Sequence, residues 1–311
     1  MEAFLAILII MPGRDSSALQ QHLRKLAPGL DIRAWPEQGD PDEIRCAVTW
    51  NHPHGLLREF NNLTLIHSFG AGVDHLLQDN ALPVDIPICR VVDPGLASQM
   101  CQYLQCIILN RRFAMQTYWQ QQQEMLWQAA ERVPGNSVGI LGLGKLGEAV
   151  ARSLVENGFT VHCWSRTEKQ VNGIISHTGT HGLEQLAASA DYLVCLLPLT
   201  AETRGILNRD LFLKMKPSAY LINVGRGGHL LEEDLVQALN SGQLSGACLD
   251  VTASEPLPAS DPLWTAKNIT ITPHISSLSD PLVVAEQVLA NYQRRLSGRP
   301  VENAVNRDLG Y

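Results

Sequence analysis

The stretch Val138-Gly139-Ile140-Leu141-Gly142-Leu143-Gly144-Lys145-Leu146-Gly147 decides the fold of one half of this 311-residue chain. Its apolar start predicts a buried strand, and glycines follow at positions 142, 144 and 147. The helical pattern after the third glycine ends at Asn157-Gly158, a typical helix C-terminus. A second apolar run, Phe159–Trp164, follows at once. The stretch therefore predicts a complete strand–helix–strand unit.

The three glycines predict a binding site for the pyrophosphate of a nicotinamide dinucleotide. Gly142 permits a tight turn, Gly144 lets the backbone approach the phosphates, and Gly147 lets the helix pack closely on the strand. The amino end of the helix stabilises the anion. A tight turn without a ligand is the alternative, but the strand before the loop and the helix after it favour the cofactor site. We expect Lys145 and Leu146, within the loop, to contact the cofactor as well.

The end of the second strand distinguishes NADPH from NADH. Enzymes that use NAD usually place Asp or Glu about 20 residues after the glycines, where the acid binds the ribose hydroxyls. This chain has Ser165, Arg166 and Thr167 there, with Lys169 just beyond. A guanidinium can pair with the 2′-phosphate of NADPH, and the two hydroxyls can add hydrogen bonds. The sequence predicts NADPH over NADH, with an exposed Arg that binds no ligand as the alternative.

Apolar runs alternate with helical patterns through most of the chain, which predicts parallel sheets covered by helices on both faces. The expected strands are Phe4–Ile10, Ile32–Trp35, Cys46–Trp50, Thr64–Phe69, Ile88–Val92, Ser137–Leu141, Phe159–Trp164, Tyr192–Leu197, Ala219–Val224, Ala247–Val251 and Asn268–Thr272. Besides the helix after the glycine loop, helices are expected at Ser17–Leu26, at Ala97–Met125 as one long helix, and at Pro281–Leu296.

Composition excludes several classes of function. A net charge of −7 argues against a broad basic face for nucleic acid. No apolar run is long enough to cross a membrane, and the first one lacks the basic start of a signal peptide. The seven cysteines form no Cys-x-x-Cys pair, which predicts buried free thiols and a cytoplasmic location. His177 and His181 are four residues apart, but they flank a poor helix, and no metal site is expected.

Three loops, each after an expected strand, carry side chains that fit one reaction. Arg226 stands among glycines, Glu255 on a proline-rich loop, and His274 after Thr272-Pro273. Taken singly, each could be an ordinary surface or loop residue. Together they provide a cation for a carboxylate, a histidine that protonates a carbonyl oxygen, and an acid that orients the histidine. Hydride transfer to a 2-oxo acid needs all three, at the strand ends where such sheets bind ligands.

The order of these motifs resembles the D-isomer-specific 2-hydroxyacid dehydrogenase family. The glycine loop comes first, then Asn223–Gly227, then Asp250 with Glu255-Pro256-Leu257, then Pro273-His274, so the resemblance covers nearly the whole chain. It implies an α/β fold of two doubly wound parallel-sheet domains. A Rossmann dinucleotide-binding domain, residues 101–275, would be inserted into a flavodoxin-like substrate domain, residues 1–100 and 276–311.

The resemblance also implies roles for single residues. Arg226, Glu255 and His274 match the family's catalytic residues, and Asp250 matches an aspartate at the nicotinamide end of the cofactor site. The family's loop amides that hold the substrate carboxylate match Ala71 and Gly72. Two further contacts are expected, from Trp50 to the substrate and from Pro198 to the cofactor.

Within the family the chain is most similar to the glyoxylate/hydroxypyruvate reductase A type, at residues 69–74, 163–167 and 307–311. We therefore expect an NADPH-dependent reductase that converts glyoxylate to glycolate and hydroxypyruvate to D-glycerate. A reductase of larger 2-oxo acids is one alternative, because Ile275–Leu278 stands where many family members have a glycine-containing segment. A corepressor-like dinucleotide sensor is another. By analogy with relatives, the long helix predicts a homodimer.

Overall fold

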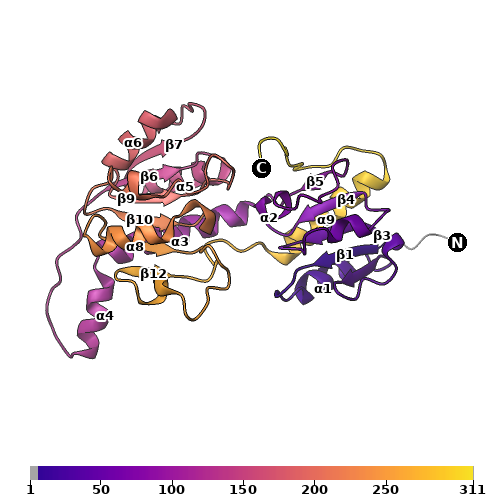
Figure 1. Ribbon diagram of the computed structural model, residues 1–311, viewed down its shortest axis with the longest axis horizontal. Helices are drawn as coiled ribbons and strands as arrows, with labels where there is room; N and C mark the ends of the chain where they lie inside the picture. The colour runs from indigo at the N-terminus through magenta and orange to yellow at the C-terminus, as the bar shows by residue number, and fades with distance from the viewer. Residues whose placement is uncertain (1–5, 311) are drawn as a thin grey trace. The chain divides into compact units, whose positions relative to one another are not determined.

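The computed structural model describes residues 6–310, which form two units (Figure 1). One unit contains the chain up to Gly95 and again from Leu278 onward, and the other contains Leu96–Ser277. We call them the outer-segment unit and the central unit. Among the described residues, no helix is both long and apolar enough to cross a bilayer.

The central unit is built on a seven-stranded sheet in the order β12-β11-β10-β9-β6-β7-β8. Every neighbouring pair is parallel. Counted along the chain, this is the 3-2-1-4-5-6 order of a Rossmann fold with one strand added. The strands are β6 (Ser137–Leu141), β7 (Thr160–Trp164), β8 (Ile174–His177), β9 (Tyr192–Cys195), β10 (Tyr220–Asn223), β11 (Gly246–Leu249) and β12 (Ile269–Ile271).

Helices cover both faces of this sheet because alternate residues of each strand point to opposite sides. Tyr192 and Val194 of β9 pack in one apolar cluster with α3 (Pro94–Arg112) and α5 (Lys145–Glu156). The residues between and after them, Leu193 and Cys195, pack in another cluster with the helices of the second face. Those helices are α6 (Gly179–Ser189), α7 (Arg209–Phe212) and α8 (Glu232–Asn240).

The outer-segment unit has a five-stranded parallel sheet in the order β2-β1-β3-β4-β5, which is the flavodoxin-like order. Its strands are β1 (Ala6–Ile10), β2 (Asp31–Ala34), β3 (Ile44–Thr49), β4 (Leu65–Ser68) and β5 (Ile88–Cys89). Helix α1 (Ser17–Leu26) packs against α9 (Pro281–Leu296), which also contacts β4, so the last helix of the chain packs in the unit that the first strands form. Short α2 (Asp74–Leu77) packs in an apolar cluster with residues of β1, β3 and β4. The predicted fold class, two doubly wound parallel-sheet units, is confirmed.

The single helix predicted over Ala97–Met125 is wrong. Helix α3 ends at Arg112, Ala114 takes a left-handed backbone conformation with φ 53°, and α4 (Met115–Gln123) begins after it. Four residues of α3 are buried, whereas α4 buries none. The chain therefore leaves the sheet where its packing ends, and no Pro or Gly marks that point in the sequence.

Smaller differences lie at the sheet edges. The prediction omitted β8, an edge strand whose four residues are all at least partly exposed, so that they lack a clear apolar pattern. His177 ends β8 and His181 lies in α6, so the two histidines do not share a helix. Strand β5 is shorter than the predicted Ile88–Val92, and the first two residues of the predicted Phe4–Ile10 lie outside the described residues.

Candidate functional site

The glycine loop joins β6 to α5 and requires each of its glycines in a different way. Gly142 has φ 109°, and a Cβ atom there would lie 2.9 Å from the Leu196 carbonyl oxygen. A Cβ atom on Gly147 would lie 1.9 Å from the carbonyl oxygen of Gly142, so any side chain would push the helix away. At Gly144 no atom lies within 4 Å of the Cβ position. The loop thus presents an open backbone face at the amino end of α5, which suits a pyrophosphate.

The loop after β7 lies beside the glycine loop, because β6 and β7 are neighbours in the sheet. The amide of Gly142 donates to the carbonyl of Trp164 at 2.9 Å, and Lys169 Nζ donates to the carbonyl of Leu143. Buried Ser165 donates from Oγ to the Thr167 carbonyl at 2.8 Å, which closes a turn around exposed Arg166. The structure therefore brings the predicted phosphate-binding residues next to the glycines.

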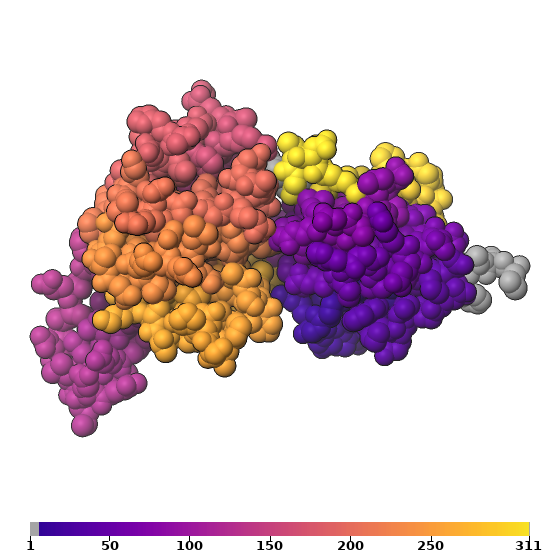
Figure 2. Space-filling model, viewed as in Figure 1, coloured from indigo at the N-terminus to yellow at the C-terminus, as the bar shows by residue number. Residues whose placement is uncertain are grey.

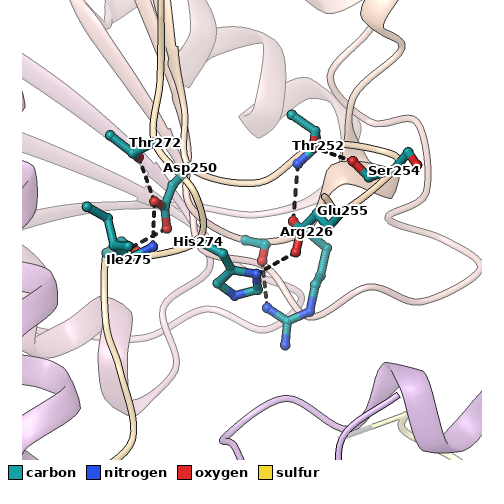
Figure 3. A network of polar contacts seen from close by, with 10 residues as sticks. Arg226, Asp250, Thr252, Ser254, Glu255, Thr272, His274 and Ile275 are labelled. Atoms are coloured by element: carbon teal, nitrogen blue, oxygen red, sulfur yellow. Dashed lines mark hydrogen bonds and ion pairs between the residues drawn. The ribbon is translucent and has the colours of Figure 1, made fainter. Parts of the chain in front are cut away.

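His274 and Glu255 form a hydrogen-bonded pair. His274 Nδ1 lies 2.8 Å from Glu255 Oε2, and the side chains are 19% and 36% exposed (Figure 3). Because a carboxylate only accepts, Nδ1 carries the hydrogen of this bond, and Nε2 is the ring nitrogen that does not bond to Glu255. The other oxygen of Glu255 accepts from the amide of Thr252 at 3.3 Å, so the acid is itself held in place.

Asp250 fixes the loop that carries His274. Its Oδ1 accepts from Thr272 Oγ1 at 2.6 Å and from the Ile275 amide at 2.9 Å, and its Oδ2 accepts from the Ser276 amide at 2.9 Å. His274 has φ 54°, a left-handed conformation that costs on the order of 1 kcal/mol outside glycine. The bonds to buried Asp250 hold the backbone in this conformation. Both carboxylate oxygens are thus used within the protein, and the contact of Asp250 with the cofactor stays a prediction.

Tyr103 extends this network from α3. Its hydroxyl lies 2.6 Å from Thr272 Oγ1 and 3.4 Å from Cys248 Sγ. Since Thr272 donates its proton to Asp250, Tyr103 donates to Thr272. Burial raises the pKa of Tyr103, which keeps the phenol protonated, and raises the pKa of the Cys248 thiol to about 11. Sequence reasoning missed Tyr103, because no motif links it to a partner 169 residues away.

Arg226 leaves the end of β10 on a loop that is packed closely on its neighbours. A Cβ atom at Gly227 would lie 1.9 Å from the carbonyl oxygen of Thr252, so this glycine lets the loop approach the one that carries Glu255. Fully buried His229 accepts from the Arg226 amide at 3.0 Å and lies 3.2 Å, through Nε2, from the carbonyl oxygen of Pro198. In Figure 3 the Arg226 guanidinium and the His274 ring extend from their loops toward the same side.

A second group of predicted residues lies in the outer-segment unit. Ser68 Oγ donates to the carbonyl of Gly72 at 2.8 Å and accepts from the amide of Gly70 at 3.2 Å, which shapes the loop after β4. Within residues 6–310, the amides of Ala71 and Gly72 donate to no protein acceptor. Adjacent N–H groups of this kind form an anion-binding concavity. Trp50 packs on this loop, since a Cβ atom at Gly70 would lie 2.5 Å from its ring.

Residues 6–310 contain no cluster of three His, Cys, Asp or Glu side chains placed to hold a metal ion. The side chains at the ends of β10, β11 and β12 offer an imidazole, a carboxylate and a guanidinium. This set can bind an anion and exchange one proton with it.

Comparison with known proteins assigns the chain to a family. The model of the D-isomer specific 2-hydroxyacid dehydrogenase NAD-binding domain matches residues 102–276. A glyoxylate/hydroxypyruvate reductase A of Yersinia enterocolitica is 41% identical over 302 residues, 95% of each chain. One of Photorhabdus laumondii is 37% identical over 99% of this chain and 100% of its own.

Solved structures agree over the full length. A D-isomer specific 2-hydroxyacid dehydrogenase from Xanthobacter autotrophicus, in complex with NADPH and MES, has a TM-score of 0.90 at 36% identity, covering 99% of this chain and 100% of its own. An NADPH-dependent glyoxylate/hydroxypyruvate reductase from Sinorhizobium meliloti, in complex with NADP and sulfate, has a TM-score of 0.90 at 32% identity and the same coverage. The chain belongs to the D-isomer-specific 2-hydroxyacid dehydrogenase family.

Proposed function

We propose that this chain is an NADPH-dependent reductase of small 2-oxo acids, converting glyoxylate to glycolate and hydroxypyruvate to D-glycerate. The observation that carries the proposal is the hydrogen bond of 2.8 Å between His274 Nδ1 and Glu255, on loops packed beside Arg226. Relatives at 37% and 41% identity are glyoxylate/hydroxypyruvate reductases A, which supports the choice of substrate.

We assign each group one role during reduction. Arg226 binds the substrate carboxylate through its planar guanidinium, and the amides of Ala71 and Gly72 offer further donors for a carboxylate oxygen. His274 donates its Nε2 proton to the oxygen at C2, and Glu255 stabilises the imidazolium from which that proton comes. NADPH, when bound, supplies the hydride.

The central unit fits NADPH, and we propose it as the dinucleotide-binding domain and the outer-segment unit as the substrate domain. Gly142, Gly144 and Gly147 leave the open backbone face that a pyrophosphate needs. The site would be completed by Lys145, Leu146, Ser165, Arg166, Thr167, Pro198 and Asp250. The turn at Ser165 presents Arg166 for the 2′-phosphate, and structural relatives bind NADPH or NADP.

A substrate panel tests the proposed activity. Purified protein is mixed with NADPH or NADH and with glyoxylate, hydroxypyruvate, pyruvate or phenylpyruvate, and oxidation is followed by absorbance at 340 nm. We expect the highest kcat/KM with glyoxylate or hydroxypyruvate and NADPH. A preference for phenylpyruvate would favour a reductase of larger 2-oxo acids. NADPH binding without oxidation by any 2-oxo acid would indicate a dinucleotide sensor.

We propose that the chain forms a homodimer through α4 and the segment that follows it. Figure 2 shows this region protruding from the body of the central unit. Trp127 is 100% exposed, Met125 93% and Trp119 53%, and large exposed apolar side chains of this kind mark protein interfaces. We expect light scattering to give twice the chain mass, and Trp127→Glu to shift the mass toward one chain. A wild-type protein with the mass of one chain would contradict the proposal.

The cysteines agree with the cytoplasmic location that we propose. All seven are free, and five of them, including Cys195 and Cys248, are buried. Free thiols are typical of proteins that work in a reducing compartment.

A further inference from the structure

An arginine stands near the carboxyl end of the sheet in the outer-segment unit. Strand β1 ends at Ile10, and a turn follows in which the Arg14 amide donates to the Met11 carbonyl at 3.1 Å. Gly13, at φ 75°, makes this turn possible. The guanidinium carbon of exposed Arg14 lies 4.7 Å from the centroid of the Trp50 ring. This is the distance of a cation–π contact, which holds the guanidinium against the indole.

The indole of Trp50 connects Arg14 with the amide loop. The benzene edge of the ring packs on the backbone of Gly70, where a Cβ atom would lie only 2.5 Å from Cζ3. The His75 ring lies 4.8 Å from the same indole and supports it. Because β1, β3 and β4 are neighbours in the sheet, all three loops leave the same edge. The guanidinium of Arg14 and the loop that offers the Ala71 and Gly72 amides therefore contact the same indole ring.

The nearest acid along the chain is directed elsewhere. Asp15 accepts from the amide and from the hydroxyl of Ser17, both at 2.8 Å, at the start of α1. These bonds lower the pKa of Asp15, so its charge is stabilised at the helix amino end. Arg14 thus adds positive potential beside an anion-binding loop, at a place where the backbone already favours negative groups.

We propose that Arg14 binds the second carboxylate of a dicarboxylic 2-oxo acid whose first carboxylate binds the loop amides. A guanidinium presents a planar fork of donors that matches a carboxylate, and the indole holds that fork in place. Glyoxylate has no second carboxylate that could bind Arg14, whereas a four- or five-carbon dicarboxylic 2-oxo acid has one at its far end. The inference rests on the proposed function, because it assigns a specificity determinant to the same reduction.

Pairs of substrates that differ only at the far end test this role. Oxaloacetate is compared with 2-oxobutyrate, and 2-oxoglutarate with 2-oxovalerate, so that a carboxylate replaces a methyl group. Wild-type protein should show a higher kcat/KM for the dicarboxylic member of at least one pair. In Arg14→Ala the ratio within that pair should fall about tenfold, the loss of one charge-assisted contact. Arg14→Lys should fall between the two, since it keeps the charge without the fork.

Arg24→Ala is the matched control, because Arg24 is an exposed arginine in the last turn of α1, at the opposite end of that helix from Arg14. It should leave the ratio unchanged. The effect of Arg14→Ala should also shrink in 0.5 M salt, because an exposed charge is screened. An unchanged ratio in Arg14→Ala, or no preference for either dicarboxylic acid in the wild type, overturns the inference. If glyoxylate is reduced in those experiments, the proposed function still stands; if no 2-oxo acid is reduced, the proposed function fails first.

Discussion

His274→Ala should lower kcat for glyoxylate by about 10²–10⁴-fold, the range for loss of a positioned general acid. The variant removes the Nε2 proton donor, and no other imidazole replaces it on this loop. NADPH binding should be retained, because the glycine loop and the Ser165 turn do not involve His274. Steady-state kinetics measure the first effect, and titration of NADPH fluorescence measures the second. A kcat within tenfold of wild type would contradict the assigned role.

Two further variants test whether the loss of activity comes from the pair of His274 and Glu255. Glu255→Gln can still accept the Nδ1 hydrogen at 2.8 Å, but it no longer neutralises an imidazolium. We expect an intermediate loss, about tenfold or more, since hydrogen bonds to a charged partner are about twice as strong as neutral ones. His181→Ala is the control, because this histidine of α6 has a side chain 82% exposed and lies far along the chain from the catalytic loops. It should have near wild-type kcat.

The sequence predicted the parts of the fold and site that local pattern determines. Strand β6 and helices α1 and α9 have the predicted bounds, because apolar periodicity is a local signal. The glycine loop was recognisable for the same reason. Two of its glycines, Gly142 and Gly147, are required because a Cβ atom there would clash with the backbone after β9 or with the loop itself, and Gly144 leaves open space.

What the sequence did not predict depends on contacts between distant segments. The helix breaks at Ala114 because α3 stops packing on the sheet there. The sequence around Ala114 contains no local signal for the end of that packing. The support of His274 by Asp250, Thr272 and Tyr103 joins α3 to two strand ends. Asp250 was recognised only by its position in a motif. Its hydrogen bonds to the His274 loop became visible with the fold.

Arg166→Ala should lower kcat/KM for NADPH about 100-fold and change kcat/KM for NADH little. Only NADPH carries the 2′-phosphate, and a bidentate, charge-assisted contact to it contributes about 3 kcal/mol. Arg166 fits this role because the turn closed by Ser165 and Thr167 presents it beside Gly142, through the pairing of Leu141 with Trp164. The ratio of the two kcat/KM values is the measurement, since it cancels general effects on folding or turnover.

Two further variants decide whether the ratio reports the phosphate contact. Arg152→Ala removes an exposed arginine of α5 that pairs with Glu148 at 2.7 Å, and it should leave the ratio unchanged. Arg166→Lys keeps the charge and should retain part of the preference, with a stronger dependence on salt because it lacks the planar fork. Lys169 lies against the glycine loop and supplies a second cation, so some preference for NADPH should survive even in Arg166→Ala. A ratio that is the same in Arg166→Ala and wild type would mean that the 2′-phosphate is recognised by other residues.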